Sequence, residues 1–483
     1  MNNFSKSQRV GLILGPAVAV IFCFLTLPGL DAVATRVVGL TLWMVVWWVT
    51  TPVPLWVTSL LPIVGGIFLN IAGGDPLENG LSTYGSYAAP VTIMCIGIFV
   101  LGAVIEKWNL HRRIALNILN VFRGKPVAVV MGFGVATGLI SMFMSNTTAV
   151  AMLIPIAIAL NTQLGYTAKD GFSKALVLVT AYAGSIGGMA TVIGSGTNMA
   201  SVGLIENLVG IKMSFADWLT IGLPFVILIL PVATLAICKL FKVKEYDLGD
   251  TMIIKRELEA LGTMSKGEKI ASVYLIIAIL VFVFNDQIAS LVPWLQYIFN
   301  EGWGVAVLVL SFMIPVDWKK GEFLMDGKFA VEKISWGTFI LLGGALTLGG
   351  MFSACGVATW IASGLGFLKN WPPLAIIIFL CVVVSVITEA VSNFVVVAAF
   401  MPALVGVADT VNMNPLFILM AVALSSSLAF MLPSGTPPNA LVFSTNYLET
   451  KDMVKAGLVV KIIGIIIFPI VMYFIARPLS PLF

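Results

Sequence analysis

The sequence contains few charged residues, and this shortage excludes most classes of soluble protein. Charged residues make up 10% of the 483 positions, hydrophobic residues make up 59%, and the mean hydropathy is +1.04. Globular domains use far more charge, and apolar runs long enough to cross a bilayer recur along this chain. The composition therefore predicts a polytopic membrane protein embedded in the lipid bilayer, with no nucleic acid partner.

Histidine and paired cysteine are also scarce. The one histidine, His111, lies in a stretch expected to be interfacial, where a surface position is predicted. No His-Glu-x-x-His motif occurs, so an intramembrane metalloenzyme is disfavoured and the protein is not expected to be an enzyme. The cysteines lie singly in apolar surroundings and are interpreted as small buried hydrophobic residues. They are Cys23, Cys95, Cys238, Cys355 and Cys381.

Long apolar segments fill most of the chain. The first is interpreted as a retained helix rather than a signal peptide, because its apolar run is about 18 residues long and many spans follow. The expected spans are 10–28, 36–50, 54–70, 87–107, 174–211, 216–241, 269–291, 302–316, 334–352, 416–447 and 456–478. They predict an all-α membrane protein with about 11 transmembrane helices.

Two further apolar segments, 126–162 and 372–409, each have a polar break near the middle. Each arm is too short to cross the bilayer alone, so the breaks predict two re-entrant hairpins. The cationic stretch 109–125, just before the first hairpin, is expected to lie at the membrane interface.

The two hairpins belong to a duplicated unit. One constant offset superposes Gly97 on Gly344, Gly102 on Gly349, Ser141 on Thr388, Asn146 on Asn393 and Pro155 on Pro402. A second motif, Gly-(Ser/Thr)-x-x-Asn, follows each copy at 194–198 and 435–439 and is expected to break spans 174–211 and 416–447. Duplicated membrane units interrupted at matching places predict the binding site of a transporter.

The distribution of cations predicts that the repeat is inverted. With the N-terminus in the cytoplasm and the C-terminus outside, all but four of the 27 Lys and Arg residues fall on the cytoplasmic side. The exceptions are Arg36, Lys212, Lys369 and Arg477. The arm that precedes Ser145 then begins in the cytoplasm, whereas the arm that precedes Ser392 begins outside, so the hairpins enter from opposite sides.

Broken helices in the membrane suit charged ligands. The N–H groups that open a half-helix favour anions, and the carbonyls that end one favour cations. The four motif segments contain no Arg, Lys or His. An anion bound there would need charge compensation from elsewhere, and co-bound cations are the simplest source. Two occluding hairpin tips favour a carrier over a channel, which would need an open polar pathway.

These motifs resemble those of the divalent anion/sodium symporter family, over residues 10–480. The resemblance implies a homodimer in the cytoplasmic membrane, in which a transport domain moves like an elevator against a scaffold. Scaffold parts are expected at 1–125 and 269–371, transport parts at 126–241 and 372–483, and a cytoplasmic linker at 242–268. The resemblance also implies C4–C5 dicarboxylate substrates (succinate, malate, fumarate and 2-oxoglutarate) coupled to Na+. Sodium-independent dicarboxylate exchange, and citrate or sulfate transport, remain as alternatives.

Site residues follow by the same resemblance. The first sodium site is implied at Ser141, Ser145, Asn146 and Gly194, and the second at Thr388, Val391, Asn393 and Gly435. Substrate contacts are implied at Asn146, Thr147, Ser195, Ser392, Asn393, Phe394 and Thr436.

Four residues need separate comment. Phe394 stands where the family has Thr, which removes a hydroxyl donor and favours slim dicarboxylates over bulky tricarboxylates. Glu389, beside the second tip, either braces the hairpin by hydrogen bonding or takes part in proton or cation coupling. Glu106 and Lys107 lie at a predicted cytoplasmic boundary, where both are expected to be solvated.

Overall fold

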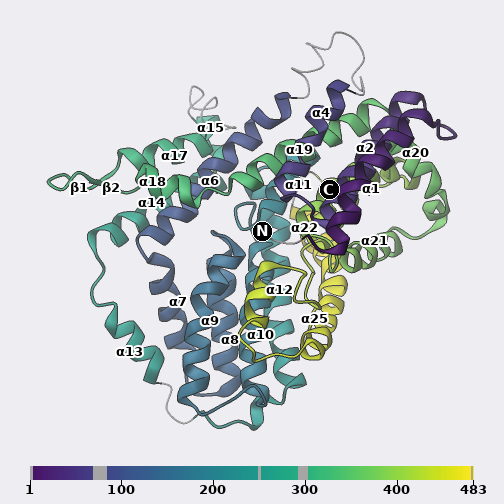
Figure 1. The fold of residues 1–483 in the computed structure, drawn as a ribbon. Helices are drawn as coiled ribbons and strands as arrows, with labels where there is room; N and C mark the ends of the chain where they lie inside the picture. Colours follow the sequence, from purple (N-terminus) through teal and green to yellow (C-terminus); the bar gives the residue numbers. More distant parts are fainter. Residues whose placement is uncertain (1–3, 69–83, 249–251, 292–302, 480–481, 483) are drawn as a thin grey trace.

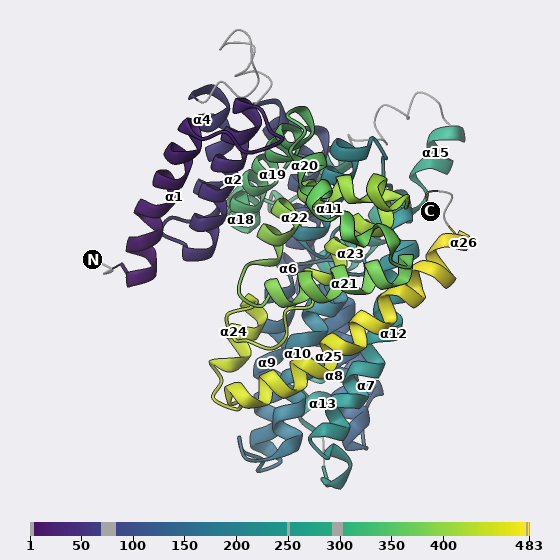
Figure 2. The ribbon, with the colours of Figure 1, turned by 90° about the vertical axis from the view of Figure 1, so that its right-hand side faces the viewer.

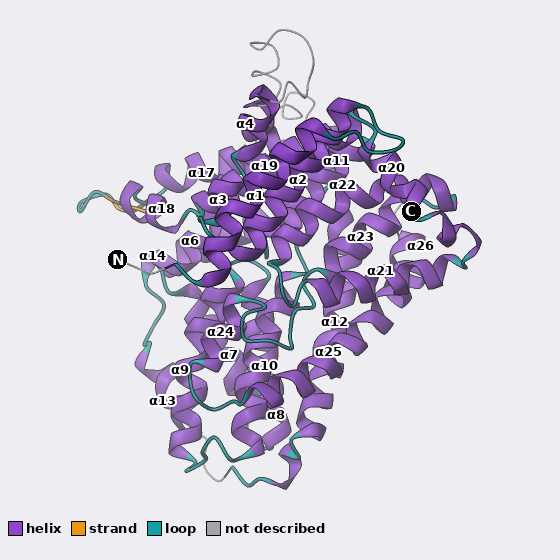
Figure 3. Ribbon diagram, turned by 45° about the vertical axis from the view of Figure 1, so that its right-hand side comes forward, coloured by secondary structure: helices purple, strands orange, loops and turns teal. Residues whose placement is uncertain are grey.

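The computed structural model describes residues 4–68, 84–248, 252–291, 303–479 and 482, and most of them lie in helices (Figure 3). Seven helices among these residues are long and apolar enough to cross a membrane, and shorter apolar helices accompany them. The predicted all-α polytopic fold is thereby confirmed. Residues 69–70 and 302, at the ends of two predicted spans, lie outside the described residues.

The first half of the chain contains α1 (Lys6–Phe24), α2 (Ala32–Thr50), α3 (Leu55–Thr58), α4 (Leu61–Phe68), η1 (Ser86–Ala88), α6 (Pro90–Lys107), α7 (Leu110–Val121), α8 (Pro126–Ser141), α9 (Asn146–Gln163), α10 (Gly171–Gly188), α11 (Gly196–Val209) and α12 (Phe215–Leu240). The linker contains η2 (Val243–Glu245) and α13 (Met252–Ala260).

The second half contains α14 (Lys266–Val283), α15 (Asn285–Leu291), α17 (Trp303–Met313), the short antiparallel pair β1 (Pro315–Asp317) and β2 (Glu322–Phe323), α18 (Gly327–Lys333), α19 (Trp336–Ala354), α20 (Val357–Gly364), η4 (Gly366–Asn370), α21 (Pro373–Ile387), α22 (Asn393–Val411), α23 (Pro415–Ser425), α24 (Pro437–Phe443), α25 (Thr450–Val471), the π-helical turn η5 (Met472–Ala476) and α26 (Arg477–Leu479).

The duplication predicted from sequence is visible as a repeated order of helices, in which α6–α12 match α19–α25. Both hairpins begin with proline at the first helical turn, Pro126 in α8 and Pro373 in α21, where the missing N–H costs nothing. The segment 353–371, expected only as a connector, folds into α20 and η4. It takes the place in the second half that α7 takes in the first.

Matched glycines allow close packing at matched places. A Cβ on Gly97 would lie 1.7 Å from the carbonyl oxygen of Gly304, and one on Gly344 would lie 2.3 Å from that of Ser59. Neither backbone neighbour can yield to such a contact, so α6 packs on α17, and α19 on the end of α3, only because these positions lack a side chain.

The hairpin helices of the two halves interlock. Helices α8, α9 and α10 pack together, as do α21, α22 and α23, while α11 packs on α22 and α24 packs on α9 and α10. Figures 1 and 2 show α8–α10 extending toward one end of the molecule and α1, α2 and α4 lying toward the other. A site between the hairpin tips is therefore built from residues far apart in the sequence.

The helix breaks lie earlier than predicted. Helix α10 ends at Gly188 and α23 at Ser425, whereas the next helices begin only after Ser195 and Thr436. Both motifs thus supply a cap and the first turn of the second half-helix instead of the break itself. The reason is local, because the Ser195 and Thr436 side chains accept hydrogen bonds from the helix backbone, as N-cap residues do.

The environment of His111 also differs from expectation. The prediction of a surface histidine was wrong: His111 is buried, and its Nδ1 lies 3.1 Å from the carbonyl oxygen of Ile105. Arg113 of α7 reaches the carboxylate of Glu268, which lies at the end of the linker, at a distance of 2.7 Å. Hydrogen bonding to Arg113 holds the pKa of the Glu268 carboxyl below its usual value. The linker is thereby tied to α7.

Candidate transport site

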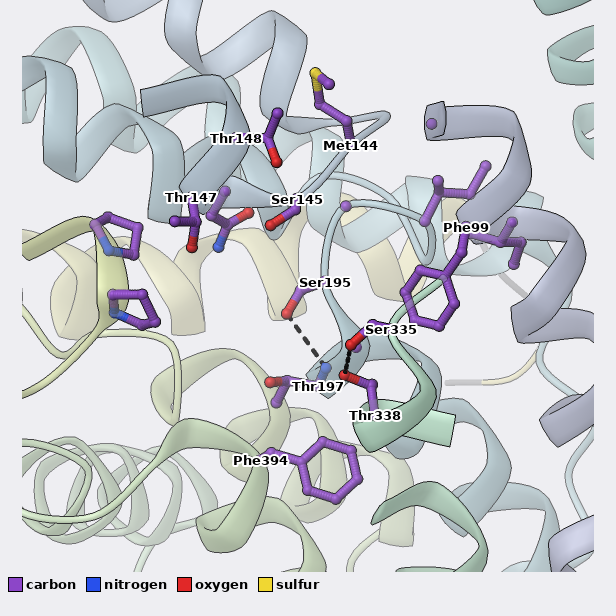
Figure 4. A pocket seen from close by; sticks show the side chains of 18 of the residues that line it. Phe99, Met144, Ser145, Thr147, Thr148, Ser195, Thr197, Ser335, Thr338 and Phe394 are labelled. Atoms are coloured by element: carbon purple, nitrogen blue, oxygen red, sulfur yellow. Dashed lines mark hydrogen bonds between the residues drawn. The ribbon is translucent and has the colours of Figure 1, made fainter. Parts of the chain in front are cut away.

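A cavity of about 390 Å³ lies where four helices begin, namely α9, α11, α22 and α24 (Figure 4). Both hairpin tips and both Gly-(Ser/Thr)-x-x-Asn motifs line it, together with residues of α6, α18 and α19. Figure 4 shows Ser145, Thr147 and Ser195 on one side of the cavity and the ring of Phe394 on another, with Thr338 between them.

The electrostatic character of the cavity follows from these helix starts. The N-cap residues Ser195 and Thr436 satisfy one backbone N–H each with their own side chains. Ser145 and Ser392, the N-caps of α9 and α22, make no such side-chain bond. The first N–H groups of the hairpin helices are therefore open to a ligand, and helix dipoles favour an anion there.

Behind the first tip, oxygen atoms gather around the amide of Asn146. Ser141 Oγ lies 2.8 Å from the Asn146 amide oxygen and donates to the carbonyl of Gly184 at 2.6 Å. The same amide atom lies 3.0 Å from the carbonyl oxygen of Gly194 and 3.3 Å from that of Gly184. The amide can present its oxygen, which suits a cation, or turn over so that its NH₂ donates to both carbonyls.

Two glycines make room for this cluster. A Cβ on Gly188 would lie 2.2 Å from the Asn146 amide oxygen, and one on Gly194 would lie 2.5 Å from the Gly188 carbonyl oxygen and 2.9 Å from that of Ser141. The Gly194 carbonyl reaches Asn146 only because the backbone passes this closely.

The second tip repeats the same hydrogen bonds. Thr388 Oγ1 donates to the Ser426 carbonyl oxygen at 2.6 Å and lies 2.8 Å from the Asn393 amide oxygen. Each half therefore has a hydroxyl, an asparagine amide and a backbone carbonyl in the same arrangement. Such sets of neutral oxygens are the ligands that hard cations prefer.

Glu389 is bound firmly and lies behind the second tip. Its carboxylate accepts backbone N–H groups of three consecutive residues, Phe430, Met431 and Leu432, at 3.0–3.1 Å. It also pairs at 2.7 Å with Lys461, whose side chain is 4% exposed. Of the two roles considered for Glu389, the bracing role matches these contacts, because the carboxylate holds the unwound segment between α23 and α24.

The predicted site residues fall into two groups. Those assigned to substrate all line the cavity: Asn146, Thr147, Ser195, Ser392, Asn393, Phe394 and Thr436. Ser145, Gly194 and Gly435, assigned to sodium, line it as well. Ser141 and Thr388 lie fully buried behind the tips, and Val391 lies in the turn between α21 and α22.

Sequence reasoning missed the part of the site that α6, α18 and α19 supply. These residues are Ile98, Phe99, Gly102, Ala103, Glu106, Lys333, Ser335 and Thr338. Of these residues, only Gly102 was marked by the sequence pattern, because it matches Gly349 at the offset of the repeat. The remaining lining residues lie within the predicted motifs or directly beside them: Phe143, Met144, Thr148, Ile193, Gly196, Thr197, Pro437 and Pro438. Their place in the chain could have suggested them.

The expectation that Glu106 and Lys107 are solvated was wrong. Glu106 lines the cavity and pairs with Lys333 at 2.5 Å, while Lys107 pairs with Asp326 at 3.0 Å. The reason is tertiary, because α18 and the β1–β2 turn fold back onto the end of α6. Asp326 and Lys333 thereby reach the two boundary residues.

Fold and site together define a membrane transporter with two opposed hairpins around one anion-compatible cavity. A family profile described as "Sodium:sulfate symporter transmembrane region" matches residues 6–480. The chain belongs to this family of membrane transporters, as the motifs indicated.

Two relatives and one solved structure support the assignment. The sodium-dependent dicarboxylate transporter SdcS of Staphylococcus saprophyticus is 33% identical over 99% of this chain and 93% of its own length. SdcS of Staphylococcus aureus (strain USA300) is 32% identical over 98% and 92%. The YdaH transporter of Alcanivorax borkumensis, at 15% identity, shares the fold with a TM-score of 0.57, covering 92% of this chain and 99% of that chain.

Proposed function

We propose that this protein carries C4–C5 dicarboxylates such as succinate, malate, fumarate and 2-oxoglutarate across the cytoplasmic membrane, coupled to sodium. It works as a homodimer with its N-terminus in the cytoplasm and its C-terminus outside. The observation that carries the proposal is the pair of hairpin tips, each with anion-favouring N–H groups facing one cavity and neutral oxygens behind. The names of the SdcS relatives agree with it.

The neutral oxygens fit sodium at two places. Ser141, Ser145, Asn146 and Gly194 would hold one ion, and Thr388, Val391, Asn393 and Gly435 the other. Sodium supplies the positive charge that the tips themselves lack. Asn146 and Asn393 couple the two ligands, because each amide reaches back to the oxygen cluster while its residue also lines the cavity.

Substrate is held by the opposite faces of the same tips. The N–H groups at the start of α9 and α22 and the side chains of Thr147, Ser195, Ser392 and Thr436 would bind its carboxylates. The cavity-facing ring of Phe394 occupies space near Thr338 and provides no hydrogen bond (Figure 4). A slim dicarboxylate suits this wall better than citrate does.

Transport requires the tips to move together. In the proposed division, 126–241 and 372–483 form the moving body, 1–125 and 269–371 form the scaffold, and 242–268 link the halves. The packing of α11 on α22 and of α24 on α9 and α10 supports it, because these contacts join the transport part of each half to that of the other. The body then carries its site across the membrane as an elevator.

Radiolabelled succinate and 2-oxoglutarate uptake into proteoliposomes tests the proposal, with and without an inward sodium gradient and with and without internal dicarboxylate. Uptake that needs the gradient and saturates supports sodium-coupled import. Uptake that needs internal dicarboxylate but no sodium would show an exchanger instead. Stronger competition by sulfate or citrate than by succinate would overturn the substrate assignment, and a purified monomer in membranes would overturn the dimer.

A further inference from the structure

An ion pair from outside the hairpins lies in the wall of the transport cavity. Glu106 belongs to the last turn of α6, and Lys333 ends α18. Lys333 Nζ lies 2.5 Å from Glu106 Oε1, and both residues line the same cavity as the hairpin tips. Their side chains are 30% and 24% exposed, so both charges remain accessible to a solute in the cavity.

Lys333 is the one cation among the described residues that line this cavity. The neighbouring Lys107 is held elsewhere, by Asp326 at 3.0 Å and by the carbonyl oxygen of Phe323 at 3.1 Å. The structure gives the Lys333 ammonium one carboxylate partner, Glu106, and places it 5.3 Å from the centre of the Phe329 ring. Because the pair is partly exposed to the cavity, it contributes modest stability, and a bound anion can replace Glu106 as the partner of Lys333.

The place of the pair in the fold determines which side of the membrane it faces. Both residues lie where α6 and α18 end, and these ends face the cytoplasm in the proposed orientation. They also belong to the proposed scaffold, whereas the tips belong to the moving body. A bound anion therefore meets Lys333 only when the cavity opens toward this end.

We propose that Lys333 is a substrate-contacting residue at the cytoplasmic mouth, where it leaves Glu106 to bind a carboxylate that enters or leaves the cavity. This inference rests on the proposed function and adds a cation that the tip motifs do not contain. Lys333 attracts the dianion, and Glu106 holds the ammonium at the mouth when no anion is present. Charges at the rim of a binding site change the rate at which the substrate associates, and therefore the half-saturating concentration, more than they change the maximal transport rate.

A series of charge variants in oriented proteoliposomes tests the proposal. The half-saturating succinate concentration at the cytoplasmic face should rise roughly threefold to tenfold in Lys333→Gln, where only the negative charge remains. It should rise less in the double variant Glu106→Gln/Lys333→Gln, and it should fall below wild type in Glu106→Gln. The half-saturating succinate concentration at the outer face should stay unchanged in all variants. Added salt should reduce the differences between the variants at the cytoplasmic face, because it screens the charges.

A purely structural ion pair would behave differently. Both single variants would then impair transport alike, the double variant would recover wild-type behaviour, and the two faces would change together. Any of these results would overturn the proposal. Lys333→Arg keeps the charge and should stay near wild type, and Lys107→Gln, which removes a neighbouring cation outside the cavity, is the matched control.

The test separates this inference from the proposed function. Anion binding is also measured directly, as the thermal stabilisation of the purified variants by succinate and by sulfate. If wild type binds and moves sulfate but not succinate, the dicarboxylate proposal fails, and the same variant order with sulfate still decides the role of Lys333. If succinate transport is intact but the order is absent, the role of Lys333 alone is refuted.

Discussion

The two hairpin tips share one plan of hydrogen bonds but rest on different supports. Ser141 and Asn146 in the first tip match Thr388 and Asn393 in the second, with hydroxyl-to-amide distances of 2.8 Å in both. The hydrogen bonds across the two helix breaks also match. Asn198 Nδ2 donates to the carbonyls of Gly188 and Thr191, and Asn439 Nδ2 donates to those of Ala429 and Leu432.

The supports differ because the helices before the breaks differ in length. Helix α10 continues to Gly188, whereas α23 already ends at Ser425 and leaves more backbone N–H groups without helical partners. Three of these N–H groups are bound by the carboxylate of Glu389, which Lys461 neutralises. In the first half, the hydroxyl of Thr191 bridges the Met142 carbonyl and the Gly194 N–H. The same site geometry is thus maintained by an ionic support in one half and a neutral one in the other.

Removing the two supports should give the largest contrast. Glu389→Ala strands a buried Lys461 and three N–H groups, and breaking a buried pair in this way costs about 3–5 kcal/mol of stability. Thr191→Ala removes neutral hydrogen bonds worth about 0.5–1.5 kcal/mol each. The unfolding transition of the purified protein in detergent should therefore shift much further for Glu389→Ala.

Adding Lys461→Met to the Glu389→Ala variant is the control. It removes the unpaired charge, so part of the lost stability should return. Equal shifts for Glu389→Ala and Thr191→Ala, or no recovery in the double variant, would mean that the ion pair does not support the second tip.

The shared plan predicts equal results at the two asparagines. Asn146→Ala and Asn393→Ala each remove an amide predicted to contact both substrate and cation. Each should lower succinate uptake by roughly a hundredfold, the scale of two or more buried hydrogen bonds to charged groups. Expression and dimerisation should be retained. Near-normal uptake by either variant would remove that tip from the site.

The two glycines of the proposed sodium sites should respond unequally to substitution. A Cβ on Gly194 would lie 2.5 Å from the Gly188 carbonyl oxygen, whereas the nearest atom to a Cβ on Gly435 is the Leu432 carbonyl oxygen at 3.3 Å. Gly194→Ala should therefore distort the first tip at a cost of about 1–3 kcal/mol and raise the sodium concentration for half-maximal uptake. Gly435→Ala should raise this concentration less. A sodium dependence altered equally in both variants would contradict this difference in space.

The sequence predicts the features that the two hairpin tips share, but it does not predict the contacts in which the two halves differ. The repeat register, the hairpin tips and the positions of the second motifs could be predicted because the same residue types recur at a constant offset, although these motifs were expected to break helices and instead cap them. The Glu389–Lys461 and Glu106–Lys333 pairs join segments far apart in the chain, and no local pattern indicates them. The burial of His111 was missed for a similar reason, since it depends on helices packed around α7.

The tip residues themselves give the smallest and most specific contrast. Thr147 and Phe394 occupy matched positions and both line the cavity, yet only Thr147 has a hydrogen-bonding side chain. Phe394→Thr should restore a donor and open space, which favours citrate relative to succinate. One neutral hydrogen bond contributes about 0.5–1.5 kcal/mol, so the ratio of the two inhibition constants should move by roughly threefold to tenfold. Competition of each acid against labelled succinate measures the ratio, and Phe394→Leu, which shortens the side chain without adding a donor, is the control. An unchanged ratio in Phe394→Thr, accompanied only by lower stability, would show that the ring supports the hairpin and does not select the substrate.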